Sequence, residues 1–596
     1  MSDFSEQPKI MFVSAFINVY MDKPEINDRG IEWRIRYFKQ LAKNHLPMII
    51  FCSAEFVSYL RRVLDEIGNT TTHLEIMDLK ETYIWQQIES IENLQLPHVR
   101  NETKDTKEYI ALMHCKPEFL QRAINMQNLP NLLHLQKQTP THYAWIDFNI
   151  YHIFNPSDTV YADRLLQNMM HRDFQKESFI AIPGCWPNQH IHLDALCNHI
   201  CWRFCGGFYI GTKNALLEMN ELYEREFMNF LHASGRMTWE VNFWAFLEYE
   251  KRWSPTWYAA DHNERMLEIC PDVCCSPLIS AASTSASSYD YPIIPGYTPS
   301  TTSHISLLEN FKEKTYKHVL NTRFVNYTIC ENGAYCIQDP HGNLKTQNMF
   351  VVLDDVHQIP KREDWKRMED DSQLVSYSDS IMGFEDIRLF PSDESPIMFV
   401  ASNKNYQADH KIRMMMGEYD ISNAKCRTVR RLDPPTDTYC EKNWIPLPGK
   451  PNSFIYRWSP FEIGELDEND HLRIIRACDK TTKIPYFGGV RGSSCFVYSN
   501  RDCAWIGVVH FSEEVCPRHY FHMLVMLHLD ENNVLVPYKY TNFFCFRRKS
   551  IEFCTGFAVD ENDSVSDEYI FWISNFDRDP ECIKVKKDTI PFHYFF

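Results

Sequence analysis

Strand-like and helix-like hydrophobic patterns alternate between residue 8 and about residue 270. Continuous apolar runs at 10–15 and 48–52 have the length of buried strands. Residues 33–41 and 56–67 carry apolar side chains at helical spacing, and a third strand-like run follows at 73–77. Strands that alternate with helices predict a parallel sheet wrapped by helices, which is an α/β domain.

The helical period disappears after about residue 315. Short aromatic and β-branched runs are separated there by turn-forming clusters, such as 339–343 (DPHGN) and 530–533 (DENN). Similar polar elements recur roughly every 50 to 60 residues, which suits four-stranded propeller blades. They lie at 322–325, 385–388, 441–444, 489–492 and 551–554. The pattern predicts an all-β domain, a five-bladed β-propeller, with a pair of β-sandwiches as the alternative.

A segment rich in Ser, Ala and Thr separates these two regimes. Residues 280–288 read SAASTSASS, and a stretch with Pro and Tyr continues to residue 300. Such a segment offers no apolar run to bury, so it predicts a linker or an extended strap. The chain is therefore expected to be multidomain, with an α/β domain at 8–278, a linker at 279–314 and a propeller-like domain at 315–596.

Composition limits the classes of function. The chain has 596 residues, 44% hydrophobic and 14% aromatic, which indicates an ordered protein of about two to four domains. Its net charge of -18 argues against nucleic-acid binding, because phosphate neutralisation needs a basic surface. The sequence contains no apolar run of about 18 residues, so no membrane span is expected.

The 20 cysteines are scattered through apolar contexts, and the first residues have no signal-peptide pattern. Cys201 with Cys205, and Cys274 with Cys275, lack a second pair at zinc-site spacing. We therefore expect reduced, mostly buried thiols in a cytoplasmic protein.

A carboxylate and an amide follow one strongly apolar run. Residues 143–150 read YAWIDFNI, so Asp147 and Asn149 stand two positions apart near the end of a predicted strand. Oxygen ligands at this spacing suit a hard divalent cation that also carries diphosphate oxygens. The alternative is a strand end capped by two turn-forming residues.

The motifs of the first half, taken in order, resemble the HtrL/YibB family of glycosyltransferases. They are 116–120 (KPEFL), the Asp147 strand, 204–211 (FCGGFYIG), 238–242 (TWEVN) and 258–262 (YAADH). The resemblance covers about residues 8 to 275 and implies a GT-A-like fold. Enzymes of the GT-A type place an Asp-x-Asp motif at a strand end, where this chain has Asp147 and Asn149. The implied partners are a nucleotide-sugar donor and a glycan or glycoprotein acceptor.

Each motif also has a candidate role of its own. Lys116, Asp147, Gly206 and Gly207 are candidates for binding the nucleotide sugar, and Asp147, Asn149 and His262 for holding Mn²⁺ or Mg²⁺. Glu240 is a candidate base for the acceptor hydroxyl. The alternatives are a β-bulge at the glycines, a salt-bridged Glu240, a structural His262 and a solvated Lys116.

In the second half, residues 383–390 (GFEDIRLF) resemble the Glu-Asp-Pro-Arg segment of the five-bladed glycoside hydrolases and mannoside phosphorylases or transferases. Ile387 stands where that segment has proline. The resemblance implies a central cavity that displays carboxylates, with Asp386 and Glu441 as acid/base candidates. Arg323, Arg388, Lys442, Trp444 and Arg491 are then candidates for glycan binding.

Together these patterns predict a glycosyltransferase that moves a sugar from a nucleotide-sugar donor to a glycan or protein acceptor. The propeller-like half would act on glycan or bind it. The alternative is a scaffold without catalytic activity, in which both halves only bind glycan.

Overall fold

The computed structural model divides the chain into a first unit, Met1–Cys274, and a second unit, Cys275–Phe596. The structure describes residues 10–595 except 21–29, 127–139, 157–158, 171–173, 175, 187–195, 197, 270–272, 274–277, 279–283, 311–314, 393–396, 483, 485, 514–517 and 562–566. Each unit has hydrophobic core clusters of its own. No helix in the described part of the chain is long and apolar enough to span a bilayer.

The first unit is built on a seven-stranded sheet in the order β3-β2-β1-β4-β6-β5-β7. β1 pairs in parallel with β2 and β4, whereas β6 runs antiparallel to β4. The predicted strands at 10–15, 48–52 and 73–77 are present. The strands are β1 (Ile10–Phe16), β2 (Met48–Cys52), β3 (Thr72–Ile76), β4 (His142–Ile146), β5 (Ile180–Gly184), β6 (Phe208–Thr212) and β7 (Thr256–Ala259).

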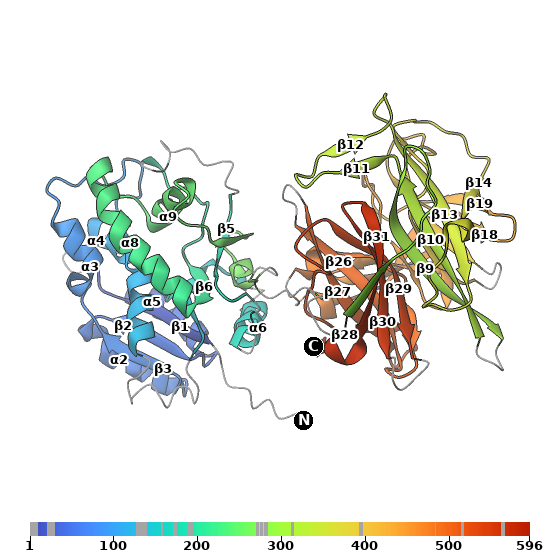
Figure 1. The fold of residues 1–596 in the computed structure, drawn as a ribbon. Helices are drawn as coiled ribbons and strands as arrows, with labels where there is room; N and C mark the ends of the chain where they lie inside the picture. Colours follow the sequence, from blue (N-terminus) through green and yellow to red (C-terminus); the bar gives the residue numbers. More distant parts are fainter. Residues whose placement is uncertain are drawn as a thin grey trace. The chain divides into compact units, whose positions relative to one another are not determined.

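Helices cover both faces of this sheet (Figure 1), because alternate strand residues point to opposite sides. Val13 and Trp145 lie in the core on one face, with Phe119 of α5. Phe12 and Ile146 lie in the core on the other face, with Phe38 of α1. The described helices are α1 (Ile31–Ala42), α2 (Ala54–Glu66), α3 (Tyr83–Glu89), α4 (Lys107–His114), α5 (Lys116–Asn125), α6 (Thr159–Met170), α8 (Lys213–Ser234) and α9 (Glu240–Tyr249).

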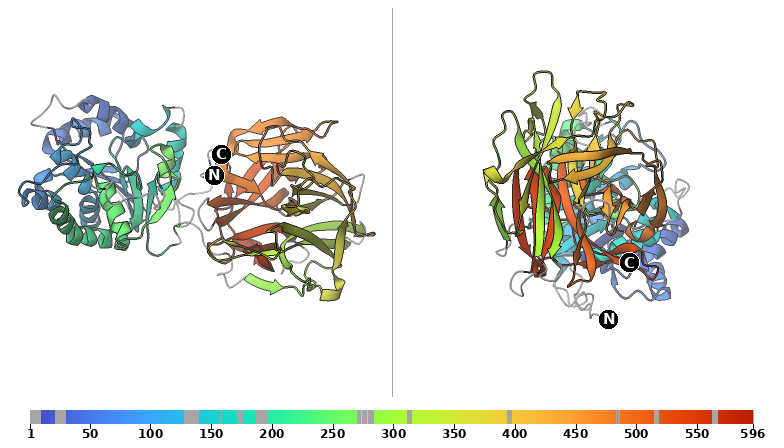
Figure 2. Two further views of the ribbon diagram at one scale, coloured as in Figure 1. Left: turned by 90° about the horizontal axis from the view of Figure 1, so that it is seen from above. Right: turned by 90° about the vertical axis from the view of Figure 1, so that its right-hand side faces the viewer.

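The second unit is β-rich, and its described residues form strands joined by loops and a few short 3-10 helices (Figures 1 and 2). Twenty of its strands fall into five successive groups of four with antiparallel neighbours, and the parallel pair β14/β19 joins the first two groups into one nine-stranded sheet that also includes β15 (Ile381–Met382). β11 (Tyr327–Ile329) and β12 (Tyr335–Ile337) form a separate two-stranded sheet. The innermost strand of the first group packs against strands of the second and fifth groups.

The first group contains β9 (Thr298–Asn310), β10 (Thr315–Val325), β13 (Leu344–Leu353) and β14 (Lys366–Asp370). The second contains β16 (Glu385–Phe390), β17 (Met398–Asn403), β18 (Arg413–Asp420) and β19 (Lys425–Leu432). The third contains β20 (Ile445–Leu447), β21 (Lys450–Trp458), β22 (Phe461–Leu466) and β23 (Leu472–Cys478). The fourth contains β24 (Val490–Gly492), β26 (Ala504–Glu513), β27 (His519–Leu529) and β28 (Leu535–Tyr540), and β25 (Val497–Ser499) and β32 (His593–Tyr594) pair at its edges. The fifth contains β29 (Glu552–Asp560), β30 (Glu568–Asn575), β31 (Arg578–Lys586) and β8 (Thr284–Ser288).

Much of the segment interpreted as a linker, 279–314, is part of the second unit; its residues 279–283 and 311–314 lie outside the described residues. β8 pairs with β31, with Ser288 opposite Glu581, and so supplies the fourth strand of the fifth group. Backbone hydrogen bonds can hold an edge strand of small polar residues without an apolar face. β9 pairs with β10, and Ser300 and Thr302 are fully buried in it. Their small side chains fit where β9 packs against several other strands.

Candidate functional site

Asp147 lies directly after β4, at the carboxyl end of the parallel strands. Its backbone N–H donates to Gly207 O at 2.8 Å, and its Oδ1 accepts from Trp145 Nε1 at 2.8 Å. One third of the Asp147 side chain remains exposed, at 33%. Ligands of open α/β sheets bind outside the carboxyl ends of the strands, so this carboxylate occupies the expected edge.

The surroundings of Asp147 form a cavity of about 260 Å³, here named the β4 cavity. Asn149, Gly206, Gly207, Glu240 and His262 also line it. β4 ends at Ile146, so Asp147 and Asn149 belong to the turn after the strand and not to the strand itself. The cavity brings together all the candidates predicted in the first half of the chain.

A buried charge pair lies behind Asp147. Lys116 Nζ is 2.8 Å from Glu240 Oε1, 2.8 Å from Gly206 O and 3.5 Å from Asp147 Oδ1. The three ammonium protons of Lys116 thus face three acceptors, and only 1% of its side chain is exposed. Lys116 is therefore placed to position Asp147 rather than to extend toward a diphosphate.

The ion pair of Lys116 and Glu240 shifts the pKa of both residues. Burial alone would lower the pKa of Lys116, but the charges of Asp147 and Glu240 outweigh it and raise this pKa above its usual value. Burial alone would raise the pKa of Glu240, but the Lys116 charge and hydrogen bond lower it below its usual value. A lowered pKa weakens a carboxylate as a base, which favours the salt-bridged alternative for Glu240 over the role of general base.

A side chain would clash at Gly206 and would be tight at Gly207. A Cβ at Gly206 would come within 2.3 Å of Glu240 Oε1 and 3.0 Å of Lys116 Nζ. A Cβ at Gly207 would lie 3.1 Å from Met266 Cε and 3.6 Å from Asp147 Oδ2. Their function is thus to let the backbone approach the charged groups closely.

Sequence reasoning missed several groups on the wall of the β4 cavity. Arg34, near the start of α1, stacks over the Tyr20 ring at 5.6 Å, and Lys104 lies over the Tyr109 ring at 5.1 Å. Trp33 and Trp202 add aromatic surface. The available signal was that residues 33–34 lie in the first turn of the helix that follows the first strand, because anion sites often form at the start of such a helix.

His262 lies three residues after the end of β7. Its Nδ1 is 3.7 Å from Cys185 Sγ and 3.5 Å from Asp261 Oδ1, and its ring packs edge-on against Trp202. Its hydrogen bond with Cys185 raises the pKa of His262, although burial opposes the shift. The described contacts therefore connect His262 to a cysteine, in addition to placing it on the cavity wall.

In the second unit, three charged candidates, Arg323, Asp386 and Lys442, form one cluster with Glu385. Arg323 lies 2.8 Å from Glu385 and 3.0 Å from Asp386, and Lys442 Nζ lies 3.0 Å from Glu385 Oε2. The cations lower the pKa of Glu385 to about 2, against its burial. Tyr327 donates to Asp577 Oδ2 at 2.9 Å beside the same cluster.

The other candidates of the second unit have different surroundings. Trp444 is 1% exposed, so neither face of its ring is open to a sugar, and its Nε1 donates to Glu441 Oε2 at 2.9 Å. Glu441 also accepts from Thr438, so its carboxylate supports the loop before β20. Arg388 is 1% exposed and donates to Asn443 and to the backbone at Ser493. Arg491 lies on β24 and is exposed.

No family model and no curated protein sequence matches the chain. Solved structures do match, at low identity. A glycosyl hydrolase from Bacteroides ovatus has 10% identity and a TM-score of 0.31, over 51% of this chain and 93% of that one. A mannose phosphorylase from Leishmania mexicana, in complex with phosphate, has 9% identity and a TM-score of 0.28, over 51% and 88%. Mouse xyloside xylosyltransferase 1 has 9% identity and a TM-score of 0.23, over 42% and 85%.

Proposed function

We propose that the first unit is a GT-A-like domain that transfers a sugar from a nucleotide-sugar donor to an acceptor hydroxyl on a glycan or protein. The observation that carries the proposal is the position of Asp147. Its partly exposed carboxylate lies at the carboxyl end of a central strand, on the wall of a cavity, with the buried Lys116–Glu240 pair behind it. A fixed carboxylate at this edge of an α/β sheet suits a phosphorylated ligand that arrives with a cation.

Room for the nucleoside lies at the neighbouring strand ends. A second cavity of about 470 Å³ is lined by Ser53, Glu55 and Asp78, which follow β2 and β3, and it shares Tyr20 with the β4 cavity. Carboxylates there offer acceptors for ribose hydroxyls. Arg34 and Lys104 supply positive charge on the wall of the β4 cavity, where the diphosphate would lie.

The residues near Asp147 fit a divalent cation. Asp147 supplies a carboxylate and Asn149 an amide oxygen, and both line the same cavity. Hard oxygen ligands suit Mn²⁺ or Mg²⁺, which take their remaining ligands from water and phosphate. Such a cation would neutralise the negative charge that develops on the leaving diphosphate.

The chain's own residues position the reaction. In the transfer, a lone pair of the acceptor oxygen forms the new bond to the anomeric carbon. The bond from that carbon to the diphosphate oxygen breaks, and its electron pair leaves with the nucleoside diphosphate. The acceptor proton passes to solvent or to a basic group at the cavity. Lys116, held by Glu240 and the Gly206 carbonyl, lies 3.5 Å from Asp147 Oδ1 and keeps this carboxylate in place, and the absence of a Cβ at Gly206 leaves room for the Lys116–Glu240 pair.

The direct test is a thermal-shift screen of the whole chain against nucleotide sugars, with and without Mn²⁺, followed by an assay of donor hydrolysis. We expect one class of donor to raise the melting temperature in a manner that depends on Mn²⁺. If no nucleotide sugar raises the melting temperature of the protein and none is hydrolysed by it, the proposal is wrong.

Arg34→Gln should raise KM for the donor about 10-fold and change kcat little. A lost cationic contact to a bound diphosphate costs about 1.4 kcal/mol, and each 1.4 kcal/mol corresponds to about a tenfold change in affinity. Arg36→Gln is the matched control, because Arg36 is an exposed residue of the same helix and does not line the cavity. Equal KM values for the two variants would exclude Arg34 from the donor site.

We further propose that the second unit is a five-bladed propeller that binds glycan at the cluster of Arg323, Glu385, Asp386 and Lys442. A specific observation favours a ligand site there. Asp386, Asn443 and Asp577 adopt left-handed backbone conformations, with φ of 50°, 66° and 51°. Asp and Asn tolerate this region better than other non-glycine residues, and left-handed conformations of non-glycine residues often cluster at binding sites.

Asp386→Asn should weaken glycan binding by the whole chain at least about tenfold, and lower the free energy of unfolding by about 2 kcal/mol. Asparagine tolerates the left-handed conformation, so the backbone should be retained. The whole chain is required, because a fragment starting at 315 would lack β8 and β9. A glycan array compares wild type and variant. A loss of stability without any change in glycan binding would assign the cluster a purely structural role.

A further inference from the structure

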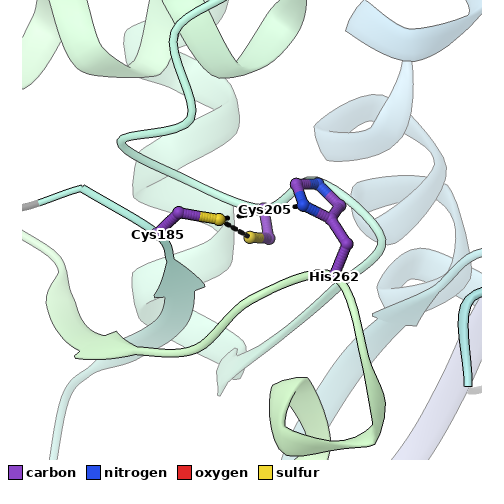
Figure 3. Close-up of side chains that lie close together, drawn as sticks. All are labelled: Cys185, Cys205 and His262. Carbon is purple, nitrogen blue, oxygen red and sulfur yellow. Dashed lines mark hydrogen bonds between the residues drawn. The ribbon is translucent and has the colours of Figure 1, made fainter. Parts of the chain in front are cut away.

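Two cysteines and a histidine meet at the edge of the first unit's sheet, although they are distant in the sequence (Figure 3). Cys185 directly follows β5, Cys205 precedes β6 and His262 follows β7. These strands are neighbours in the order β6-β5-β7, which explains why the three side chains converge. Their donor atoms all lie within 4.8 Å of one another.

The backbone around the cluster is fixed. Cys205 N–H donates to Pro183 O at 2.7 Å, and Cys185 N–H donates to Trp202 O at 3.0 Å. Ala260 N–H donates to Gly184 O at 3.1 Å, which holds the segment that leads to His262. The three side chains are thus presented by hydrogen-bonded segments.

The separations match the edges of a tetrahedral metal site. With Zn–S bonds of about 2.3 Å and Zn–N bonds of about 2.0–2.1 Å, two sulfurs lie about 3.8 Å apart and a sulfur and a nitrogen about 3.5 Å apart. Cys185 Sγ is 3.6 Å from Cys205 Sγ and 3.7 Å from His262 Nδ1. Cys205 Sγ and the His262 ring nitrogen lie within 4.8 Å of each other, so a single ion can contact all three donors once the side chains adjust.

A fourth ligand is at hand. Asp261 Oδ1 lies 3.5 Å from Cys185 Sγ and 3.5 Å from His262 Nδ1, which is close to a tetrahedral edge in both cases. Its side chain is largely exposed, at 78%, but its Oδ1 accepts from the His262 N–H at 2.7 Å, so the carboxylate has to turn away from this bond to enter the fourth position. Two cysteines, a histidine and a carboxylate form a ligand set that suits zinc.

We propose that Cys185, Cys205 and His262, with Asp261 in the fourth position, bind a zinc ion. This site is separate from the oxygen-ligand site at Asp147 and does not depend on the proposed transferase activity. Cys205 immediately precedes Gly206, whose carbonyl accepts from Lys116, and His262 lines the β4 cavity. The zinc ion therefore fixes one wall of that cavity by joining the segments after β5, before β6 and after β7.

The test measures metal content and affinity in the reduced whole chain. Protein dialysed against Zn²⁺ and then freed of loose metal should retain about one zinc ion per chain. Co²⁺ in place of zinc should give a thiolate-to-cobalt charge-transfer band, which reports sulfur ligation directly. Cys185→Ser, Cys205→Ser and His262→Ala should each weaken Zn²⁺ binding about 100-fold or more and remove or alter the band.

Two matched variants separate this site from its neighbours. Cys201→Ser changes a buried free cysteine four residues from Cys205 and should keep both zinc and the cobalt band. Asp147→Asn should also keep them, whatever it does to sugar transfer, so failure of the two proposals can be told apart. Reduced wild-type protein that retains no zinc, or cysteine and histidine variants that bind it as well as Cys201→Ser does, would overturn the proposal. Conversion of Cys185 and Cys205 to a disulfide in protein that binds no zinc would overturn it as well.

Discussion

Asp147→Ala should reduce donor hydrolysis and sugar transfer by about 100-fold or more and leave the fold intact. Loss of a charged cation ligand removes about 3 kcal/mol or more of transition-state stabilisation, and each 1.36 kcal/mol is a factor of about 10 in rate. The side chain is one-third exposed, and its two described partners keep other contacts: Lys116, 3.5 Å away, remains bonded to Glu240 and Gly206 O, and Trp145 stays buried in the core, so the fold should be retained. Initial rates at saturating donor and Mn²⁺ measure the effect.

Asp147→Asn is the sharper companion variant, because it keeps the shape of the side chain and removes only the charge. We expect it to be nearly as inactive as Asp147→Ala, since an amide neutralises a cation poorly. Melting temperatures within a few degrees of wild type would establish that both variants are folded. Turnover at the wild-type rate in either variant would show that Asp147 does not bind the cation and would refute the proposed site.

The strands of the first unit could be predicted because their signal is local. A buried parallel strand is apolar on both faces, so the runs at 10–15 and 48–52 are visible without any partner. The position of Asp147 followed from the same pattern, since the apolar run ends at Ile146. The partners of Asp147 did not, because Lys116 and Glu240 lie 124 residues apart and nothing local connects them.

The same limit explains why 279–314 was read as a linker. β8 reaches its partner β31 almost 300 residues later, and an edge strand of small residues carries no hydrophobic period. Pairing of this kind is held by backbone groups, which every residue possesses. The composition of the segment reflects its small polar side chains, whereas its strand pairing depends on backbone hydrogen bonds that composition does not reveal.

A residue type that suits sugar binding does not reveal where its side chain points in the fold. The recurring element at 441–444 suggested an acid/base role for Glu441 and glycan binding for Lys442 and Trp444. Lys442 joins the charged cluster at Glu385, whereas Trp444 and Glu441 turn into the core and hydrogen-bond to each other. Similarly, Cys185 and His262 are 77 residues apart and meet only because β5 and β7 pair.

Lys116→Met should destabilise the first unit by about 3–5 kcal/mol. Its removal leaves the Glu240 carboxylate buried without its counter-charge, because only 7% of the Glu240 side chain is exposed. Calorimetry of the whole chain should show a lower transition for the first unit, with that of the second unit unchanged. The exposed pair of Lys39 and Glu66 offers the control, and Lys39→Met should change little because water already solvates both charges.

The double variant Lys116→Met/Glu240→Gln should recover much of the lost stability, since neither buried charge remains.

The stabilisation by the Lys116–Glu240 pair should depend on pH with a definite sign. Because the pKa of Glu240 is lowered, its carboxylate stabilises the folded state above the usual carboxyl pKa, and this stabilisation is lost as pH falls through the lowered value. Because the pKa of Lys116 is raised, its ammonium group stabilises the folded state below the usual lysine pKa, and this stabilisation is lost as pH rises through the raised value. The difference in stability between wild type and the double variant should therefore be constant from about pH 5 to pH 10 and should change below about pH 4. If Lys116→Met melts as wild type does, or if that difference varies across neutral pH, the pair does not carry the charges assigned to it.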